Sequence, residues 1–291
     1  MRRLFQGMQI LAHPGPTHAL GAALVLSLLV SACSANDSSA ASAGSPRVGD
    51  SSSVDTAAVS DAGAGWTIVG LGDSFTKTQN AQGDTYLDLF ATHLQEARHV
   101  PVTVNDLSDD ANTSAKLADD LLHDAMTREA VAVADIVLVS VGGNDSDPFA
   151  TYPSGTCAPS QPLFRCLRTY APTFTRNYRK ILQGVEALRA GRPTAVRVTS
   201  ADNPFVGWSE APTETFGVDF YRQVAEAETA AACRIATLYG ARCVDYLHLF
   251  GGADGTLDPA PYLGTDHAHP GDAGIRLIAD VLAQLDVPEL G

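Results

Sequence analysis

Positive charge and long apolar runs are both scarce in this sequence. Its 291 residues include 19 Lys and Arg against 33 Asp and Glu, which gives a formal net charge of −14. A nucleic-acid-binding surface needs clustered cations, so this balance argues against that class of protein. No stretch reaches the roughly 18–20 consecutive apolar residues of a membrane span. An apolar content of 45% is still high enough for a folded domain with a buried core.

Residues 1–33 have the pattern of a bacterial export signal. Two arginines near the start precede an apolar run over residues 19–30, and small residues then lead to Cys33. The segment Val30-Ser31-Ala32-Cys33 resembles a lipobox, in which the cysteine becomes the lipidated first residue and its acyl chains hold the protein at a membrane. The alternative is a plain signal peptide that is cut near Ala32. We therefore expect an exported protein that is lipid-anchored at Cys33 or, in the alternative, secreted.

Residues 34–65 contain almost no large apolar side chains and are rich in Ser, Ala, Gly and Asp. Such a segment cannot bury enough surface to offset the entropy lost on ordering, so we expect a flexible tether. The remaining residues, 66–291, are sufficient for one domain with a sizeable core. We expect this domain to be a monomer.

Cysteine is scarce as well, and only four follow Cys33. Cys157 and Cys166 are close in sequence, as are Cys233 and Cys243. In an exported protein an even number with short local spacings predicts two disulfides, 157–166 and 233–243, although the other pairings of the four stay open. Zinc binding is the competing interpretation, but neither pair has the short gap of a metal knuckle. We therefore expect no bound metal.

Short apolar segments alternate with segments of helical periodicity. The expected strands cover residues 66–71, 100–107, 135–141, 195–200 and 242–247. The expected helices cover residues 84–97, 113–123, 174–190, 218–239 and 272–285. The third strand is apolar almost throughout, as a parallel strand buried on both faces must be. The pattern predicts an α/β fold, a three-layer α/β/α sandwich with a central, mostly parallel five-stranded sheet and with its chemistry at the carboxyl ends of the strands.

Two polar motifs follow directly after expected strands. Gly72-Asp73-Ser74 follows the first strand, where a serine on an open turn can act as a nucleophile. Gly142-Gly143-Asn144-Asp145 follows the third strand, where an asparagine amide can donate a hydrogen bond to a developing oxyanion. Both sequences also occur as ordinary turns, so neither motif decides the function by itself.

A third motif, Asp266-His267-Ala268-His269-Pro270, comes just before the last expected helix. Asp266 and His269 are three residues apart, so the carboxylate can reach the imidazole, fix its tautomer and leave the other ring nitrogen free as a base. A histidine in a loop is usually solvated, and we expect this of His267.

Together, in this order, the three motifs resemble those of the SGNH hydrolases, also called the GDSL esterase/lipase family. The resemblance covers residues 66–285 and implies the flavodoxin-like sheet of that family. It implies a catalytic triad of Ser74, His269 and Asp266. It also implies that the backbone N–H of Ser74 and the side chain of Asn144 contribute to the oxyanion hole. The chain lacks a Gly-x-Ser-x-Gly elbow, which argues against the α/β-hydrolase fold.

One family element departs from the pattern. The family places a glycine after the second strand, and its N–H joins the oxyanion hole. Aligning Asn112-Thr113-Ser114 with the usual polar residues puts Ala111 at this position, where it can still donate its N–H unless the site needs a positive φ. Asp110 is the alternative register. We expect both Asp109 and Asp110 to face water, because a carboxylate in the hole would oppose the developing charge.

The resemblance further implies hydrolysis of carboxylic acid esters, either simple acyl esters or lipids, through an acyl-enzyme and without a metal or organic cofactor. The acidic charge favours neutral esters. The alternatives are an O-deacetylase of cell-envelope glycans and a non-catalytic binding lipoprotein that keeps the fold. Two segments are candidates for the wall of a substrate pocket. They are an insertion over residues 146–173, with Phe149, Tyr152 and Phe164, and the segment over residues 203–208.

Overall fold

Five short parallel strands form the centre of the fold. The structure is a computed structural model that describes residues 65–146, 163–209 and 217–291. The strands are β1 (Trp66–Gly72), β2 (Val102–Asp106), β3 (Ile136–Ser140), β4 (Ala195–Thr199) and β5 (Arg242–Val244). They lie in the order β2-β1-β3-β4-β5, and each pair of neighbours is parallel. The predicted five-stranded sheet is confirmed.

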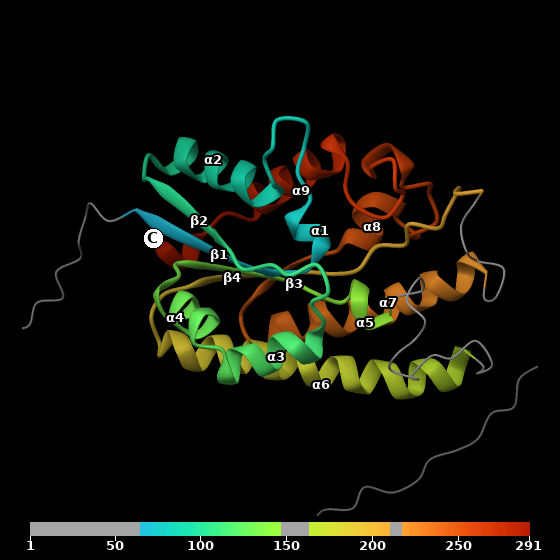
Figure 1. Ribbon diagram of the computed structural model, residues 1–291, viewed down its shortest axis with the longest axis horizontal. Helices are drawn as coiled ribbons and strands as arrows, with labels where there is room; N and C mark the ends of the chain where they lie inside the picture. The colour runs from blue at the N-terminus through green and yellow to red at the C-terminus, as the bar shows by residue number, and fades with distance from the viewer. Residues whose placement is uncertain (1–64, 147–162, 210–216) are drawn as a thin grey trace, which may run out of the picture. The chain divides into compact units, whose positions relative to one another are not determined.

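Helices cover both faces of this sheet (Figure 1). One layer contains α2 (Tyr86–Arg98), α8 (Tyr246–Gly251) and α9 (Asp272–Leu285). The other contains α3 (Ser114–His123), α4 (Ala125–Val133), α6 (Leu163–Arg189) and α7 (Val218–Leu238). The short elements are α1 (Ser74–Lys77), α5 (Gly143–Ser146) and the 3-10 turns η1 (Ala260–Tyr262) and η2 (Pro288–Leu290). The arrangement is the predicted α/β/α sandwich.

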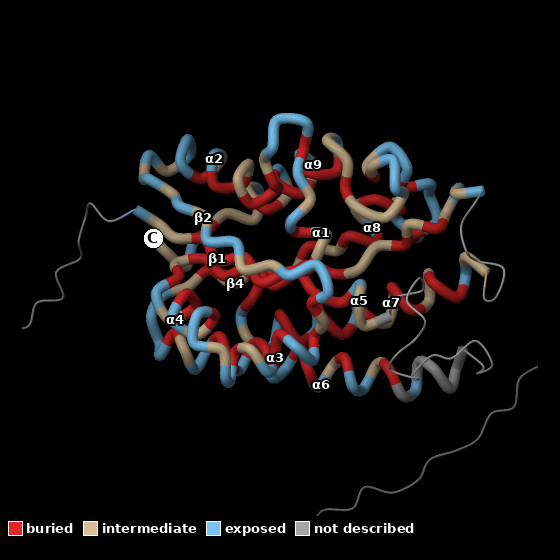
Figure 2. Tube along the Cα trace, in the orientation of Figure 1, coloured by how far each residue is buried: buried red, intermediate tan, exposed pale blue. Residues whose placement is uncertain are grey.

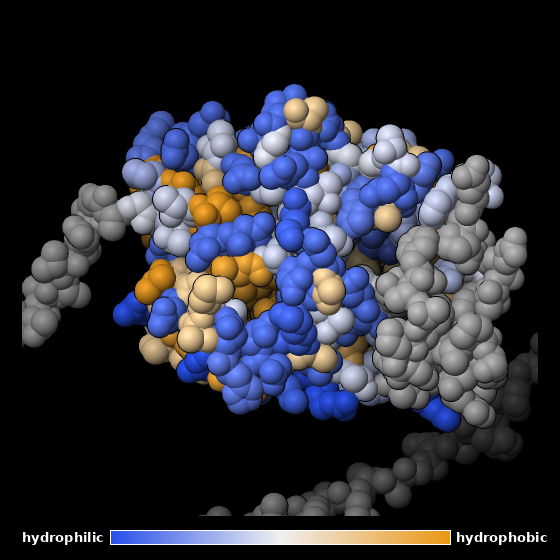
Figure 3. Space-filling view, in the orientation of Figure 1, coloured by the Kyte–Doolittle hydropathy of each residue, from blue (hydrophilic) through white to orange (hydrophobic). Residues whose placement is uncertain are grey.

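Alternate side chains of β3 enter two different cores. Ile136 and Leu138 pack with residues of α2 and α9, whereas Val137 and Val139 pack with residues of α3, α6 and α7. Figure 2 shows the buried residues concentrated in the sheet and along the inner sides of the helices. The face seen in Figure 3 is mostly hydrophilic, with hydrophobic patches beside the edge strand β2. Burial on both faces is the reason that the central strand is a continuous apolar run.

The helices differ from the sequence prediction in two main places. α6 begins at Leu163 and contains Pro172, so residues 163–173 of the expected insertion are helical. The sequence predicts a later start, at residue 174, and a proline usually marks a helix boundary. α4 is absent from the prediction, although Asp124 caps it by accepting a hydrogen bond from Thr127 N–H at 2.7 Å.

The predicted disulfide between Cys233 and Cys243 is present and links α7 to β5. The predicted pair 157–166 lies outside the residues whose side chains the structure describes. Residues 1–64, which hold the expected export signal, Cys33 and nearly all of the tether, also lie outside the description. No helix in the described ranges is both long enough and apolar enough to cross a membrane.

Candidate active site

The register of the sheet brings the first two motifs to the same edge. Gly72 of β1 pairs with Ser140 of β3, and the N–H of Asp73 donates to the Ser140 carbonyl at 3.1 Å. Ser74 therefore opens α1 beside the point where Asn144 lies in the first turn of α5. The strand-end rule used on the sequence correctly placed these two motifs together.

Ser74 is held at the start of a helix by a tight turn. A Cβ at position 72 would collide with the side chain of Thr76, so only glycine allows this turn. Asp73 Oδ1 accepts a hydrogen bond from Phe75 N–H at 3.0 Å, and burial raises the pKa of Asp73 to about 7. The first N–H groups of a helix have no intrahelical partner, and the N–H of Ser74 makes no hydrogen bond to the described residues, so it is available to a ligand.

The loop before α9 presents the third motif. Leu263 and Pro270 form an isolated antiparallel bridge, and Gly264 N–H donates to the His269 carbonyl at 2.8 Å. Inside this closed loop, Asp266 Oδ1 accepts hydrogen bonds from two backbone N–H groups at 3.0 and 3.1 Å. These bonds fix the Asp266 carboxylate relative to the imidazole of His269.

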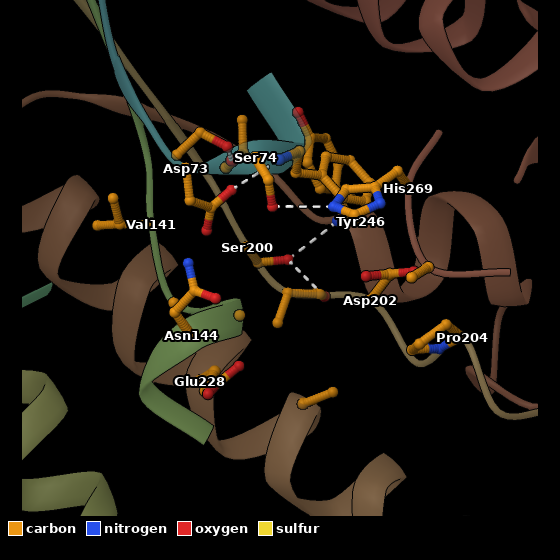
Figure 4. Close-up of a pocket in the computed structure, with 18 of the residues that line it drawn as sticks. Asp73, Ser74, Val141, Asn144, Ser200, Asp202, Pro204, Glu228, Tyr246 and His269 are labelled. Atoms are coloured by element: carbon orange, nitrogen blue, oxygen red, sulfur yellow. Dashed lines mark hydrogen bonds between the residues drawn. The ribbon is translucent and has the colours of Figure 1, made fainter. Parts of the chain in front are cut away.

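Ser74, His269 and Asp266 form a connected row of side chains. His269 Nε2 lies 2.9 Å from Ser74 Oγ (Figure 4), and His269 Nδ1 lies 2.7 Å from Asp266 Oδ2. Burial raises the pKa of Asp266, but hydrogen bonds from Ala268 N–H and from His269 outweigh this and hold it below its usual value. The ionised carboxylate can only accept, so Nδ1 carries a hydrogen and Nε2 can accept the hydroxyl hydrogen of Ser74.

The second motif also fixes the segment before α3. Asn144 Nδ2 donates to the carbonyl oxygens of Asp110 and Asn112, both at 2.9 Å. Asp145 accepts hydrogen bonds from the N–H and the hydroxyl of Ser114 at 2.7 and 2.5 Å. Since both partners of the Asn144 amide are carbonyls, its nitrogen must face them. The second motif therefore positions the turn in which the family glycine is expected.

A model of the GDSL-like lipase/acylhydrolase family matches residues 71–277. The chain belongs to this family. The resemblance drawn from the three motifs is confirmed, and the protein is a hydrolase of ester bonds. A search among curated proteins gives no significant match.

Solved structures of esterases and lipases share the fold of this GDSL-like hydrolase. A lipase from a goat rumen metagenome has a TM-score of 0.61 and 15% identity, covering 78% of this chain and 100% of its own. The extracellular lipase of Streptomyces rimosus has a TM-score of 0.53 and 16% identity, covering 76% and 99%. An acetylxylan esterase from Geobacillus stearothermophilus has a TM-score of 0.52 and 20% identity, covering 79% and 95%. At these identities the similarity establishes the fold.

Ala111 lies in the turn between β2 and α3 of the GDSL-like hydrolase. The N–H of Asn112 closes this turn on the Asp109 carbonyl at 2.8 Å, and Ala111 N–H lies 3.4 Å from Asp109 Oδ1. Ala111 is exposed and is not among the described residues with a positive φ, so its backbone is unstrained. It is also not among the described residues that line the cavity beside Ser74. A role of Ala111 in the oxyanion hole stays a prediction.

The two acidic neighbours of Ala111 face solvent, as the sequence predicts. Asp110 pairs with Lys77 at 2.9 Å and Asp109 with Lys116 at 3.5 Å, and the two aspartate side chains are 71% and 51% exposed. Each negative charge thus has a cationic neighbour at the surface.

A cavity of about 290 Å³ opens beside Ser74 and His269 in the GDSL-like hydrolase. Pro204 and Phe205 line it, which confirms that the segment after β4 forms part of the pocket wall. The other aromatic residues in its described wall are Phe75, Tyr221 and Tyr246. The side chains of Phe149, Tyr152 and Phe164, expected in the insertion, lie outside the description.

Sequence reasoning missed two carboxyl groups of the cavity wall, those of Asp202 and Glu228. Asp202 lies shortly after β4, where the strand-end rule could have found it. Glu228 is 1% exposed and accepts a hydrogen bond from the Tyr170 hydroxyl. Glu228 lies four residues after the buried Val224, and this helical spacing places a carboxyl group on the buried face of α7.

Across the described ranges, no three or more His, Cys, Asp and Glu side chains cluster as a metal site would require.

His267 is not simply solvated, and this expectation was wrong. Its φ is 56°, and its ring stacks on Trp208 with the centroids 5.2 Å and the planes 8° apart. Trp208 in turn stacks on Phe205 at 6.2 Å. Local spacing cannot show this contact, because the tryptophan comes from a loop that is distant in the sequence. The stack connects the loop of His269 to the cavity wall.

Proposed function

We propose that the protein is a serine esterase that hydrolyses neutral carboxylic acid esters through Ser74, His269 and Asp266. The observation that supports this most directly is the pair of contacts at His269, 2.9 Å to Ser74 Oγ and 2.7 Å to Asp266 Oδ2. A nucleophile within reach of a base, and a base oriented by a carboxylate, is the arrangement that acyl transfer needs. It also speaks against a non-catalytic binding protein.

In the first half of the reaction, Ser74 Oγ attacks the ester carbonyl carbon while His269 Nε2 takes the hydroxyl proton. The Asp266 carboxylate stabilises the imidazolium that forms. The carbon–oxygen bond to the alcohol then breaks, and Nε2 gives the proton to the leaving oxygen. An acyl group remains on Ser74.

In the second half, water attacks the acyl carbonyl and gives a proton to His269 Nε2. The bond to Ser74 Oγ breaks, Nε2 returns the proton to that oxygen, and the carboxylic acid leaves. The same imidazole thus acts as base and acid in each half of the cycle.

The negative charge on the carbonyl oxygen needs hydrogen-bond donors in both halves. We assign Ser74 N–H, at the start of α1, and the Asn144 amide, which lines the cavity. The amide would exchange one of its two carbonyl partners for the oxyanion. Ala111 N–H would exchange its long contact to Asp109, 3.4 Å from N to Oδ1, in the same way. Removing one such donor typically lowers the rate constant by roughly 10²–10³-fold.

The preference for neutral esters rests on the cavity wall. None of the described residues that line it is Lys or Arg, whereas three carry carboxyl groups. An anionic substrate would find no counter-charge there. The acyl and alcohol parts of the substrate can be determined with a panel of neutral short-, medium- and long-chain esters. Release of acetate from an acetylated polysaccharide is measured beside this panel. Release from the polysaccharide alone would favour the O-deacetylase alternative.

The catalytic assignment is tested by Ser74→Ala and His269→Ala, each of which should abolish ester hydrolysis in a folded protein because the two groups act as a unit. His248→Ala is a matched control. His248 Nδ1 lies 2.6 Å from Asp245 Oδ2 with the same three-residue spacing, but no described serine contacts its other ring nitrogen. Wild-type turnover by folded Ser74→Ala would refute the proposal.

We also infer export with a lipid anchor at Cys33, supported by the lipobox-like segment Val30-Ser31-Ala32-Cys33. The wild-type protein should partition with membranes, and Cys33→Ser should release it or block its maturation. Mature wild-type protein in the medium with an unmodified N-terminus would instead show a plain signal peptide.

A further inference from the structure

Three carboxyl groups are among the polar residues that line the active-site cavity. Asp73 Oδ1 accepts a hydrogen bond from Phe75 N–H, and Glu228 Oε1 accepts one from the Tyr170 hydroxyl. Asp202 Oδ2 is among the buried side-chain oxygens that have no hydrogen-bond partner in the described part of the chain. A buried acceptor without a partner is destabilising, and it is rare in native proteins unless water or a ligand completes the bond.

The position of Asp202 relates it to one part of the substrate. It lies in the loop after β4 and lines the cavity, with its carboxyl group between His269 and Pro204 in Figure 4. Asp202 and the imidazole are near enough to interact electrostatically. Because His269 delivers the proton to the leaving alcohol, a group beside it faces the alcohol part of the ester rather than the acyl part.

The chemistry of this carboxyl group favours a hydroxyl as its partner. Burial raises the pKa of Asp202 to about 7, so both protonation states are present at neutral pH. A hydroxyl can donate to the carboxylate and can accept from the carboxylic acid, whereas an ammonium group pairs only with the carboxylate. A partner that suits both states binds over a wider pH range.

We propose that Asp202 is a specificity-determining residue that hydrogen-bonds a free hydroxyl on the alcohol part of the ester. The substrate class is then a partial ester of a polyol, such as a diol, a glycerol or a sugar. This inference rests on the proposed function, because Asp202 lines the cavity in which Ser74 would act.

The test compares two acetate esters of equal length. 2-Hydroxyethyl acetate and propyl acetate differ only in a hydroxyl that replaces a methyl group. The wild-type protein should have a kcat/KM for the hydroxyl ester roughly 10-fold or more above that for propyl acetate. Asp202→Leu should abolish this preference by lowering kcat/KM for the hydroxyl ester roughly 10-fold more than kcat/KM for propyl acetate. Asp202→Asn, which keeps an acceptor, should retain most of the preference.

Asp254→Asn removes an exposed carboxylate that does not line the cavity, and it should keep the full preference. If Asp202→Leu does not fold, Asp202→Ala takes its place.

Equal hydrolysis of both esters by the wild-type protein, or an unchanged preference in Asp202→Leu, would overturn the inference alone. An equal loss on both esters in a folded Asp202 variant would assign the residue to positioning of His269 and overturn its role in specificity. Hydrolysis of neither ester by the wild type, together with inactivity on the wider ester panel, would overturn the proposed function as well.

Acetylcholine and its uncharged isostere 3,3-dimethylbutyl acetate form a second matched pair. No Asp202-dependent preference for the cation is expected. A preference for acetylcholine that Asp202→Leu removes, without any preference for the hydroxyl ester, would replace the polyol ester by a cationic one.

Discussion

Asp145 accepts hydrogen bonds from both donors of Ser114, the backbone N–H at 2.7 Å and the hydroxyl at 2.5 Å. Ser114 is fully buried and opens α3, directly after the turn that contains Ala111. One residue earlier, Asn144 binds two carbonyls of the same turn. Asn144 and Asp145, which follow β3, therefore hold the segment after β2 together. Asn144 donates to its carbonyl groups, and Asp145 accepts from the backbone N–H and the hydroxyl of Ser114.

Asp145→Ala should lower the free energy of unfolding by about 2–3 kcal/mol, because it leaves two buried donors of Ser114 without their acceptor. Ser114→Ala keeps the bond to the backbone N–H but removes the hydroxyl from both Asp145 Oδ1 and the Asn177 amide, so it should cost about 1–3 kcal/mol. Urea unfolding of the two variants measures both losses. Wild-type stability of Asp145→Ala would show that the contact does not hold the segment.

Asn144→Ala should lower kcat by roughly 10²–10³-fold with little change in KM, because a donor to the oxyanion stabilises the transition state more than the bound ester. Asn177→Ala is the control, since Asn177 also uses its amide to bind this region, at 2.9 Å to Ser114 Oγ. Its effect should fall mainly on stability. A kcat for Asn144→Ala within a few-fold of wild type would exclude Asn144 from the oxyanion hole.

Ala111→Gly should lower stability by about 0.5–1 kcal/mol, because Ala111 has no positive φ to relieve and glycine adds entropy to the unfolded chain. The rate constant should stay within a few-fold, since the backbone N–H is retained. Thermal unfolding and ester hydrolysis check the two parts. A stabilised variant would mean that Ala111 is strained in the protein.

Asp73→Asn should change how stability depends on pH. Burial raises the pKa of Asp73 to about 7, so the native state holds the proton more tightly than the unfolded chain. The stabilisation from this proton is complete below about pH 4 and is lost as pH rises through about 7. The variant lacks this loss and should therefore be about 1–3 kcal/mol more stable than wild type at pH 8.5, and by less at pH 4.5. Asp254→Asn, at an exposed site, should show no such difference. Parallel stability curves of wild type and Asp73→Asn from pH 4.5 to 8.5 would contradict this assignment.

The sequence predicts much of the fold because its signals are local. Each strand of the sheet overlaps a segment that the sequence predicts as a strand, and the strand-end rule places Ser74 and Asn144 at one edge. The three-residue spacing of Asp266 and His269 correctly indicates that their side chains meet.

What the sequence could not predict depends on contacts between distant segments. The stack of His267 on Trp208 joins two loops. That Asp202 Oδ2 lacks a hydrogen-bond partner among the described residues also becomes visible only once its surroundings are known. Pro172 shows a different limit. A proline usually ends a helix, but Pro172 lies inside α6 and the helix continues on both sides of it.

The central claim, that Ser74 is the nucleophile, is tested most directly by covalent labelling with a fluorophosphonate followed by peptide mass analysis. Ser140 and Ser200 also line the cavity, so the reagent has two other serines within its reach. The account predicts one adduct per chain, on Ser74, with labelling much slower in His269→Ala and unchanged in His248→Ala. An adduct on Ser200 or elsewhere, or labelling of Ser74 at the same rate without His269, would contradict it.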